Sequence, residues 1–245
     1  MHCIVYPIPS VLVHIMSLPY THLAVATALS SQLPIRHTKE YFIGALIPDI
    51  RYFADVPRER THFSADLIPS YIDQASSSFL LGYMVHLLLD EVWPTLEEQY
   101  RDHFPSFVRG NLSGNRCQIA YEVYCLKQQP IQLKLSPTHN QMLEELGVSA
   151  ENVCLAAEVM QEYLDTPSLT TAFGIAKRAG VFPAHRLDDV ASIVHSIERY
   201  RPLNWLVGRL VHRPSEMLFP QLLDKIQQRV KEIGLPVGTM EPTLG

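Results

Sequence analysis

Residues 79–93, FLLGYMVHLLLDEVW, are almost wholly apolar, yet they contain His86 and Asp90. Serines at positions 76–78 precede the stretch as candidate N-caps and Pro94 follows it, so we predict one helix over about residues 76–93. A helix that is apolar on all sides lies inside a protein core. His86 and Asp90 are four residues apart and share one helix face, so both are expected to point into that core.

Asp90 requires a positive partner there, because burying an unpaired carboxylate is very costly. A metal ion is one candidate, and a simple His86–Asp90 hydrogen bond is the other. Gly82 lies one turn before His86 on the same face, where a bare backbone leaves room for another helix or for an ion. This helix alone leaves both alternatives open.

Composition restricts the possible partners. The chain has 245 residues, of which 47% are hydrophobic and 18% are charged, and its formal net charge is −5. This apolar content is enough for one large core, and the charge does not suit duplex nucleic acid, which requires a basic face. No segment has the length and apolarity of a transmembrane helix. The four cysteines form no CxxC pair. Free thiols in the cytoplasm are their simplest interpretation, with export as the alternative.

The rest of the chain has a helical pattern, without alternation of strand length. Residues 1–15 are predicted to be a leader, either disordered or read from an upstream start codon, and residues 16–245 to form a single all-helical domain. Thr21, Thr38 and Ser149 are candidate N-caps. The predicted helices besides the central one are 22–31, 39–46, 113–129, 138–146, 150–164, 168–179, 188–200 and 215–233, and residues 49–65 are predicted to be a functional loop.

Five polar side chains in the first ninety residues stand in apolar surroundings: His22, Asp49, His62, His86 and Asp90. Three imidazoles and two carboxylates, without a thiolate, form a donor set that suits zinc and also tolerates iron or manganese. Each residue alone has an ordinary explanation, such as a hydrogen-bonded core histidine or a turn aspartate after a proline. Their combination predicts a metal site.

The segments THLAVA, GALIPDI, RTHF and GYMVHLLLD, in this order, resemble the signature of the zinc-dependent phospholipase C family. That family shares an all-helical fold with the single-strand-specific zinc nucleases, and the resemblance covers roughly residues 20–93. It implies a phospholipase C/nuclease-like fold and one zinc ion bound by Asp49, His62, His86 and Asp90. It also implies that Asp90 bridges to a second zinc ion bound by His22, and that Asp49 is the general base for the attacking water.

The sequence also departs from the family pattern. In the secreted bacterial members the N-terminal Trp of the mature chain binds the second zinc, and neither Met1 nor Met16 reproduces it. A third zinc uses two further histidines and a glutamate from an HxxxE helix. His212 and Glu216 have that spacing, but we expect Pro214 between them to break the helix. We therefore predict one or two zinc ions, or another divalent metal, and no complete third site.

These features predict a zinc-dependent hydrolase that cleaves a small-molecule or lipid phosphate ester with a metal-activated water. Arg58 and Arg60 lie near His62 and are candidates for binding the phosphate group, with a solvated charged loop as the alternative. A nuclease or another phosphodiesterase of the same fold is the alternative within the enzyme class. A non-catalytic, metal-stabilised helical protein that acts as a binding or interaction module is the alternative outside it.

Overall fold

The computed structural model describes residues 19–52, 56–71, 77–103, 121–122, 124–125, 131, 133–135, 141–178 and 187–234. The described residues form helices and no strand, which confirms the all-α prediction. Residues 1–15, the predicted leader, lie outside this part of the chain. Within it, no helix combines the length and the apolarity needed to cross a membrane.

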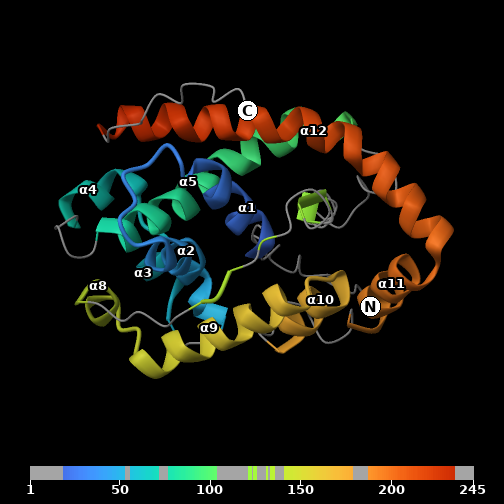
Figure 1. Cartoon of the computed structure of the whole chain (residues 1–245), viewed down its shortest axis with the longest axis horizontal. Helices are drawn as coiled ribbons and strands as arrows, with labels where there is room; N and C mark the ends of the chain where they lie inside the picture. Colours follow the sequence, from blue (N-terminus) through green and yellow to red (C-terminus); the bar gives the residue numbers. More distant parts are fainter. Residues whose placement is uncertain are drawn as a thin grey trace, which may run out of the picture.

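A long helix, α5, lies in the middle of the fold. The helix α12 runs along one side, α9 and α10 run along the other, and α1 and α2 lie between them against α5 (Figure 1). The elements, with 3-10 helices marked η, are α1 (Pro19–Leu29), α2 (Thr38–Leu46), η1 (Ile47–Tyr52), α3 (Arg58–Thr61), η2 (Ala65–Leu67), α4 (Ile68–Tyr71), α5 (Ser77–Tyr100), η3 (Arg101–His103), α8 (Gln141–Glu145), α9 (Ala150–Asp165), α10 (Leu169–Arg178), α11 (Leu187–Arg199) and α12 (Arg201–Glu232).

The central helix α5 is buried as predicted, but it does not end at Pro94. It continues to Tyr100, with Pro94 inside it. A proline in a helix interior costs about 3 kcal/mol, because a hydrogen bond is lost and the ring crowds the preceding turn. Trp93, Leu96 and Tyr100 are only 3%, 0% and 4% exposed. Burying side chains of this size contributes about 1.5–3 kcal/mol each, which is enough to offset the proline.

The break expected at Pro214 is also wrong, because α12 runs through both Pro214 and Pro220. Its C-terminal half is held by four buried side chains at four-residue spacing that face the core: Leu218, Leu222, Ile226 and Val230. This half packs on α5. The helix begins at Arg201, well before the predicted start at residue 215, because Pro202 is tolerated in the first turn.

Two glycines allow α2 and α5 to approach closely. A Cβ atom on Gly82 would lie 1.8 Å from the carbonyl oxygen of Tyr41, and one on Gly44 would lie 2.0 Å from that of Phe79. No side chain fits at either point. Of the two interpretations of Gly82, room for another helix is therefore correct. The contact brings the carbonyl groups of α2 against the face of α5 that carries His86.

Of the N-caps predicted for α9 and α2, only the one for α9 is confirmed. Ser149 caps α9 as predicted, since its Oγ accepts a hydrogen bond from the backbone N–H of Asn152 at 3.2 Å. Thr38 does not cap α2, which begins at Thr38 itself and whose N-cap residue His37 makes no side-chain cap bond. Instead, Ser78 at the start of α5 accepts the backbone N–H groups of Arg36 and His37, each at 3.0 Å. The predicted helix 113–129 lies mostly outside the described residues.

Candidate metal centre

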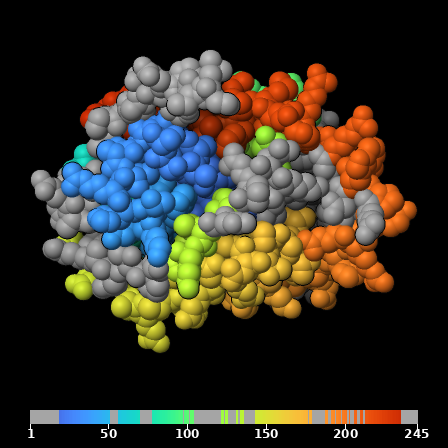
Figure 2. All heavy atoms as spheres, in the orientation of Figure 1, coloured from blue at the N-terminus to red at the C-terminus, as the bar shows by residue number. Residues whose placement is uncertain are grey.

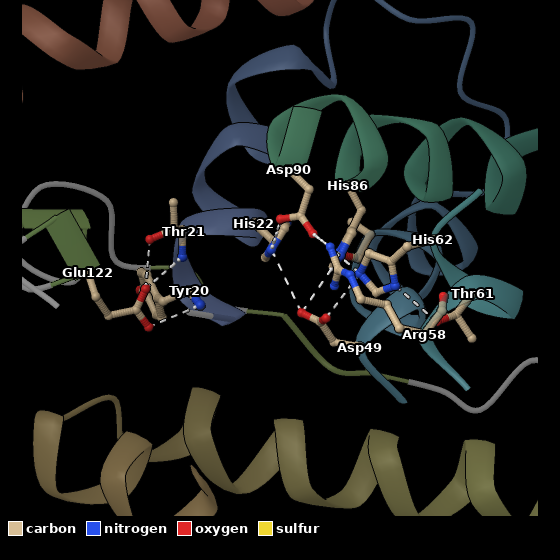
Figure 3. Close-up of polar contacts among 11 residues, drawn as sticks. Tyr20, Thr21, His22, Asp49, Arg58, Thr61, His62, His86, Asp90 and Glu122 are labelled. Atoms are coloured by element: carbon tan, nitrogen blue, oxygen red, sulfur yellow. Dashed lines mark hydrogen bonds and ion pairs between the residues drawn. The ribbon is translucent and has the colours of Figure 1, made fainter. Parts of the chain in front are cut away.

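The five predicted donor side chains lie together in one cluster. His22 comes from α1, Asp49 from η1, His62 from the residue after α3, and His86 and Asp90 from α5 (Figure 3). Asp49 is part of a regular 3-10 turn rather than a loop, because the chain tightens directly after α2. Segments that are separate in the sequence thus supply one site, which we call the His/Asp cluster.

The two carboxylates lie between the three imidazoles. His62 Nε2 is 3.4 Å from Asp49 Oδ1 and 3.3 Å from Asp90 Oδ2. His86 Nε2 is 3.7 Å from Asp49 Oδ2 and 3.9 Å from Asp90 Oδ2. His22 Nε2 is 3.8 Å from both Asp49 Oδ2 and Asp90 Oδ1. A direct His86–Asp90 hydrogen bond would require a shorter distance than 3.9 Å.

The imidazole rings are held by groups on their far sides. His86 Nδ1 donates to the carbonyl oxygen of Ala45 at 2.8 Å, so in the neutral ring Nε2 carries a lone pair that faces the carboxylates. His62 Nδ1 lies 3.0 Å from Thr61 Oγ1, and the Thr61 carbonyl accepts a hydrogen bond from the Tyr83 hydroxyl at 2.6 Å. Such bonds fix the orientation of metal-binding histidines. The rings of His22 and His86 stack at 3.7 Å between centroids.

Several polar atoms of the cluster are buried without a hydrogen-bond partner among the described residues. They are both ring nitrogens of His22, the Nε2 atoms of His62 and His86, and Asp49 Oδ1. Buried polar atoms are normally satisfied, so this concentration of them fits a bound cation. A tetrahedral zinc ion with ligands at 2.0–2.2 Å keeps its donors about 3.3–3.6 Å apart. The distances at His62, 3.3 and 3.4 Å, fall in that range, and those at His22 and His86 exceed it slightly.

The protonation states of four of the five donors also suit a cation. Burial, together with the neighbouring His86, lowers the pKa of His22 to about 3, and burial likewise lowers the pKa of His86. Both rings are therefore neutral at pH 7, which is the form that binds metals. Burial raises the pKa values of Asp49 and Asp90, but the surrounding imidazoles lower them more, so both carboxyl groups are ionised. Burial lowers the pKa of His62, and its two carboxylate neighbours reverse that shift, so the pKa lies above its usual value.

Of the two predicted arginines, only Arg58 reaches the cluster. Its Nη2 lies 3.3 Å from Asp90 Oδ2, and its Nη1 is buried without a hydrogen-bond partner among the described residues. Arg60 is exposed, and its Nη1 lies beside Gly147 instead. Residues two apart in a helix face different directions, so the four-residue helix α3 separates the pair.

A carboxylate outside the cluster holds the start of α1, the helix that carries His22. Glu122 is fully buried and accepts the backbone N–H groups of Tyr20 at 3.1 Å and Thr21 at 2.9 Å. It also accepts the hydroxyl of Thr21 at 2.8 Å (Figure 3). The hydroxyl of Tyr163 donates to Glu122 as well. The predicted cap Thr21 is thus wrong, because α1 begins at Pro19 and Glu122 receives its first N–H groups.

No third group of potential metal ligands occurs in the described ranges, where the only such groups belong to the His/Asp cluster. His212 Nδ1 lies 3.5 Å from Glu216 Oε1 on α12, with both side chains about half exposed, at 45% and 58%. The pair therefore has the predicted spacing without a buried site. The absence of a complete third site in the C-terminal half stays a prediction.

The donors lie in a part of the chain that resembles a known family. Residues 21–142 match the family model described as zinc dependent phospholipase C. This part of the chain belongs to the zinc-dependent phospholipase C family. The matched range contains every residue of the His/Asp cluster, together with Arg58 and Glu122. No curated protein and no solved structure matches the chain.

Sequence reasoning missed three contributions to the site. The Ala45 carbonyl that orients His86 has no signature in the side-chain sequence, and neither does the role of Thr61 beside His62. Glu122 did have a signal, since it stands in the apolar segment QIAYEVYCL, a context like that of Asp90. A carboxylate in such a segment indicates a buried partner, and here that partner is the N-terminus of another helix.

Proposed function

We propose that the protein is a zinc-dependent phosphodiesterase that acts on phospholipids or related phosphate diesters. The observation that supports this most is the His/Asp cluster, where nitrogen and oxygen atoms from separate segments converge on one buried point without hydrogen-bond partners among the described residues. The family of the matched range consists of metal-dependent hydrolases, and its name refers to phospholipids.

Asp49, His62, His86 and Asp90 would hold one zinc ion, and His22 would contribute to a second position that shares Asp90. The two oxygens of Asp90 support such sharing, because Oδ1 faces His22 whereas Oδ2 faces His62 and His86. When bound, zinc ions polarise a phosphoryl oxygen and lower the pKa of a bound water. His22 has few other donors beside it in the described residues, so the first position is expected to bind more tightly.

The protein's own groups would handle the proton and the phosphate. Asp49 is ionised and its Oδ1 is buried without a hydrogen-bond partner in the described part of the chain, so it can accept a proton from the attacking water. Arg58 can turn its guanidinium towards a phosphate oxygen, because its side chain is 33% exposed and Nη1 has no partner among the described residues. The donor side chains of the cluster are between 0% and 13% exposed, which limits the entry of bulk water.

The test is a metal assay followed by a substrate screen. Purified protein is dialysed, its zinc content is measured by mass spectrometry, and phosphatidylcholine, a chromogenic phosphodiester, a phosphomonoester and single-stranded DNA are offered in turn. We expect zinc at one or two ions per chain, in line with the donor set, and hydrolysis of the diesters. The variant Asp224→Asn serves as a control, because Asp224 is an exposed carboxylate on α12.

Each alternative function has a distinct outcome in this screen. Cleavage of single-stranded DNA without cleavage of the lipid would identify a nuclease of the same fold. Stoichiometric zinc with no turnover on any phosphate ester would contradict the proposal and support a metal-stabilised binding protein.

A further inference from the structure

The N-terminal half of α12 carries an exposed stripe of apolar and basic side chains. Trp205 is 62% exposed, Leu206 44%, Leu210 38% and Met217 42%. The exposed Arg209 and Arg213 lie between them on the same face, since all these positions recur every three or four residues. We call Trp205, Leu206, Arg209, Leu210, Arg213 and Met217 the α12 stripe.

The charge of this segment is opposite to that of the chain as a whole. Residues 199–217, which include the stripe, contain four arginines and a single carboxylate, Glu216, although the chain has a net charge of −5. The guanidinium carbon of Arg209 lies 5.3 Å from the centre of the Trp205 ring. Cationic and aromatic groups are thus presented together at one level of the helix surface.

The stripe faces away from the packed sides of the helix. The C-terminal half of α12 is anchored on α5, and the N-terminal half packs on α11. Figure 1 shows the N-terminal half of α12 extending with α11 beyond the central helices, and in Figure 2 the atoms of these two segments form the outer edge of the molecule. The stripe is therefore held at a fixed angle by a helix whose other end lies in the core.

We propose that the α12 stripe docks the protein on an anionic lipid surface. Amphipathic helices with arginines beside Trp and Leu lie in the membrane interface, with the apolar side chains among the acyl chains and the cations at the headgroups. Trp is favoured at that level because its ring is amphipathic. Each arginine near an anionic leaflet adds attraction, and its long stem can bury apolar surface while the guanidinium stays in water.

Other partners fit the stripe less well. A symmetric dimer through this face would place the arginines of both copies in one interface with only Glu216 of each copy to offset their charge, because a twofold interface pairs a surface with itself. A surface that binds nucleic acid presents mainly polar and cationic groups to the phosphates. Here the exposed Trp205, Leu206 and Leu210 would occupy much of that surface. Of these three partners, lipid is the one that satisfies both the apolar and the cationic members of the stripe.

The test measures binding of the full chain to vesicles. Vesicles of phosphatidylcholine alone are compared with vesicles of equal parts phosphatidylcholine and phosphatidylglycerol, by co-sedimentation at low and high salt, with a chelator present. We expect binding only to the anionic vesicles. In Arg209→Gln/Arg213→Gln, the loss of each arginine should weaken the affinity for these vesicles about fivefold. Trp205→Ala/Leu210→Ser should weaken it about tenfold or more, because apolar burial is lost.

Matched controls remove the same kinds of group elsewhere. Lys177→Gln/Lys231→Gln removes two exposed cations, and Leu155→Ser removes a leucine that is 41% exposed on α9. Both should bind like the unmodified protein. The fluorescence of Trp205 should shift to the blue on anionic vesicles. In Trp205→Phe only Trp93 remains, and because it is only 3% exposed its emission should not change.

Equal binding by the stripe variants and the controls would overturn the proposal, as would the absence of binding to anionic vesicles. A concentration-dependent dimer that the stripe variants abolish, without vesicle binding, would assign the surface to a second copy instead. Vesicle binding is measured without metal and without turnover, so it can succeed or fail independently of the phosphodiesterase activity.

Discussion

At the scale of single residues, contacts at one ring nitrogen of a histidine determine which nitrogen faces the carboxylates of the His/Asp cluster. His86 uses Nδ1 for the Ala45 carbonyl, and His62 has Nδ1 beside Thr61 Oγ1, so both present Nε2 to Asp49 and Asp90. Without a metal, the Arg58 guanidinium would face Asp90, but the Nε2 atoms of His22 and His86 would remain buried without a hydrogen-bond partner among the described residues. The donor set and its protonation states therefore both favour a bound metal.

Substitution of the two aspartates should separate metal binding from turnover. Asp90→Asn keeps the shape of the side chain and removes its charge, so a shared anionic ligand is lost. We expect zinc affinity to fall at least about 100-fold and hydrolysis to disappear. In Asp49→Asn some zinc should remain while turnover falls steeply, because a proton acceptor is lost as well. Zinc content after dialysis and kcat are the measurements.

The opposite result has a clear meaning. If Asp90 only accepted a bond from His86, Asp90→Asn would cost about 1–3 kcal/mol in stability and leave metal content unchanged. Full zinc content in Asp90→Asn would therefore remove Asp90 from the ligand set.

At the scale of elements, the site depends on how closely α2 and α5 pack. The carbonyl oxygens of Tyr41 and Phe79 occupy the space that side chains at Gly82 and Gly44 would need. Because Ala45 follows Gly44, this spacing also places the carbonyl that orients His86. A packing feature thus determines the geometry of a donor atom.

Gly82→Ala should damage both the fold and the site. The new methyl group would overlap the Tyr41 carbonyl and push α2 away, so we expect a loss of about 1–3 kcal/mol or more in the free energy of unfolding and weaker zinc binding. Thermal denaturation and zinc titration measure the two effects. Gly174→Ala, where a Cβ meets nothing within 4 Å, is the matched control and should be neutral or slightly stabilising. An unchanged melting temperature in Gly82→Ala would contradict the close packing.

Glu122 links α1 to the rest of the fold and should make stability depend on pH. Burial raises its pKa from 4.5 to about 7, although four hydrogen-bond donors oppose the shift. Between these values the folded state retains a proton that the unfolded state has released, so the contribution of Glu122 to stability falls as pH rises from about 4.5 to 7. The fall should be about 3 kcal/mol.

The measurement is the free energy of unfolding of the unmodified protein minus that of Glu122→Gln across this pH range. The difference isolates Glu122, because the cluster titrates in both proteins. Burial lowers the pKa of His22, which acts in the opposite direction: its contribution to stability rises as pH increases from about 3 to the unfolded value of 6.5. A difference that does not change with pH would show that Glu122 titrates as an ordinary surface carboxylate.

At the scale of the whole molecule, the cluster joins segments that are far apart in the chain. Its donors come from α1, η1, the end of α3 and α5. Outside the cluster, Arg229 of α12 forms ion pairs with Glu91 at 2.9 Å and with Asp66 at 3.3 Å. A metal in the cluster would therefore act as a cross-link between separate helices. The α12 stripe lies on the same long helix as Arg229, which connects the outer surface to the core.

Zinc should raise the stability of the whole N-terminal half. A ligand that binds only the folded state adds about 4 kcal/mol at a concentration a thousandfold above its Kd. We expect the melting temperature to rise with free zinc concentration in the unmodified protein and in Asp224→Asn, and to stay constant in Asp90→Asn. A calorimetric titration over a range of zinc concentrations measures this. An increase of the same size in Asp90→Asn would place the stabilising ion elsewhere.

The donor groups of the site were predictable from the sequence, because they depend on residue type and local spacing. The apolar run around His86 and Asp90 predicted a buried helix with two polar groups on one face, and the donor set predicted a metal. The separation of Arg58 from Arg60 could also have been predicted, since residues two apart cannot share a helix face.

Only the tertiary structure decided how far the helices extend and what holds them. Pro94 and Pro214 predicted helix ends, but each carries a local cost of about 3 kcal/mol that the burial of neighbouring side chains can exceed. Thr21 was the local candidate for capping α1, and Glu122, about a hundred residues away, receives the N–H groups instead. Local rules compare a residue with its neighbours in sequence, whereas these outcomes depend on contacts between segments that meet only in the folded chain.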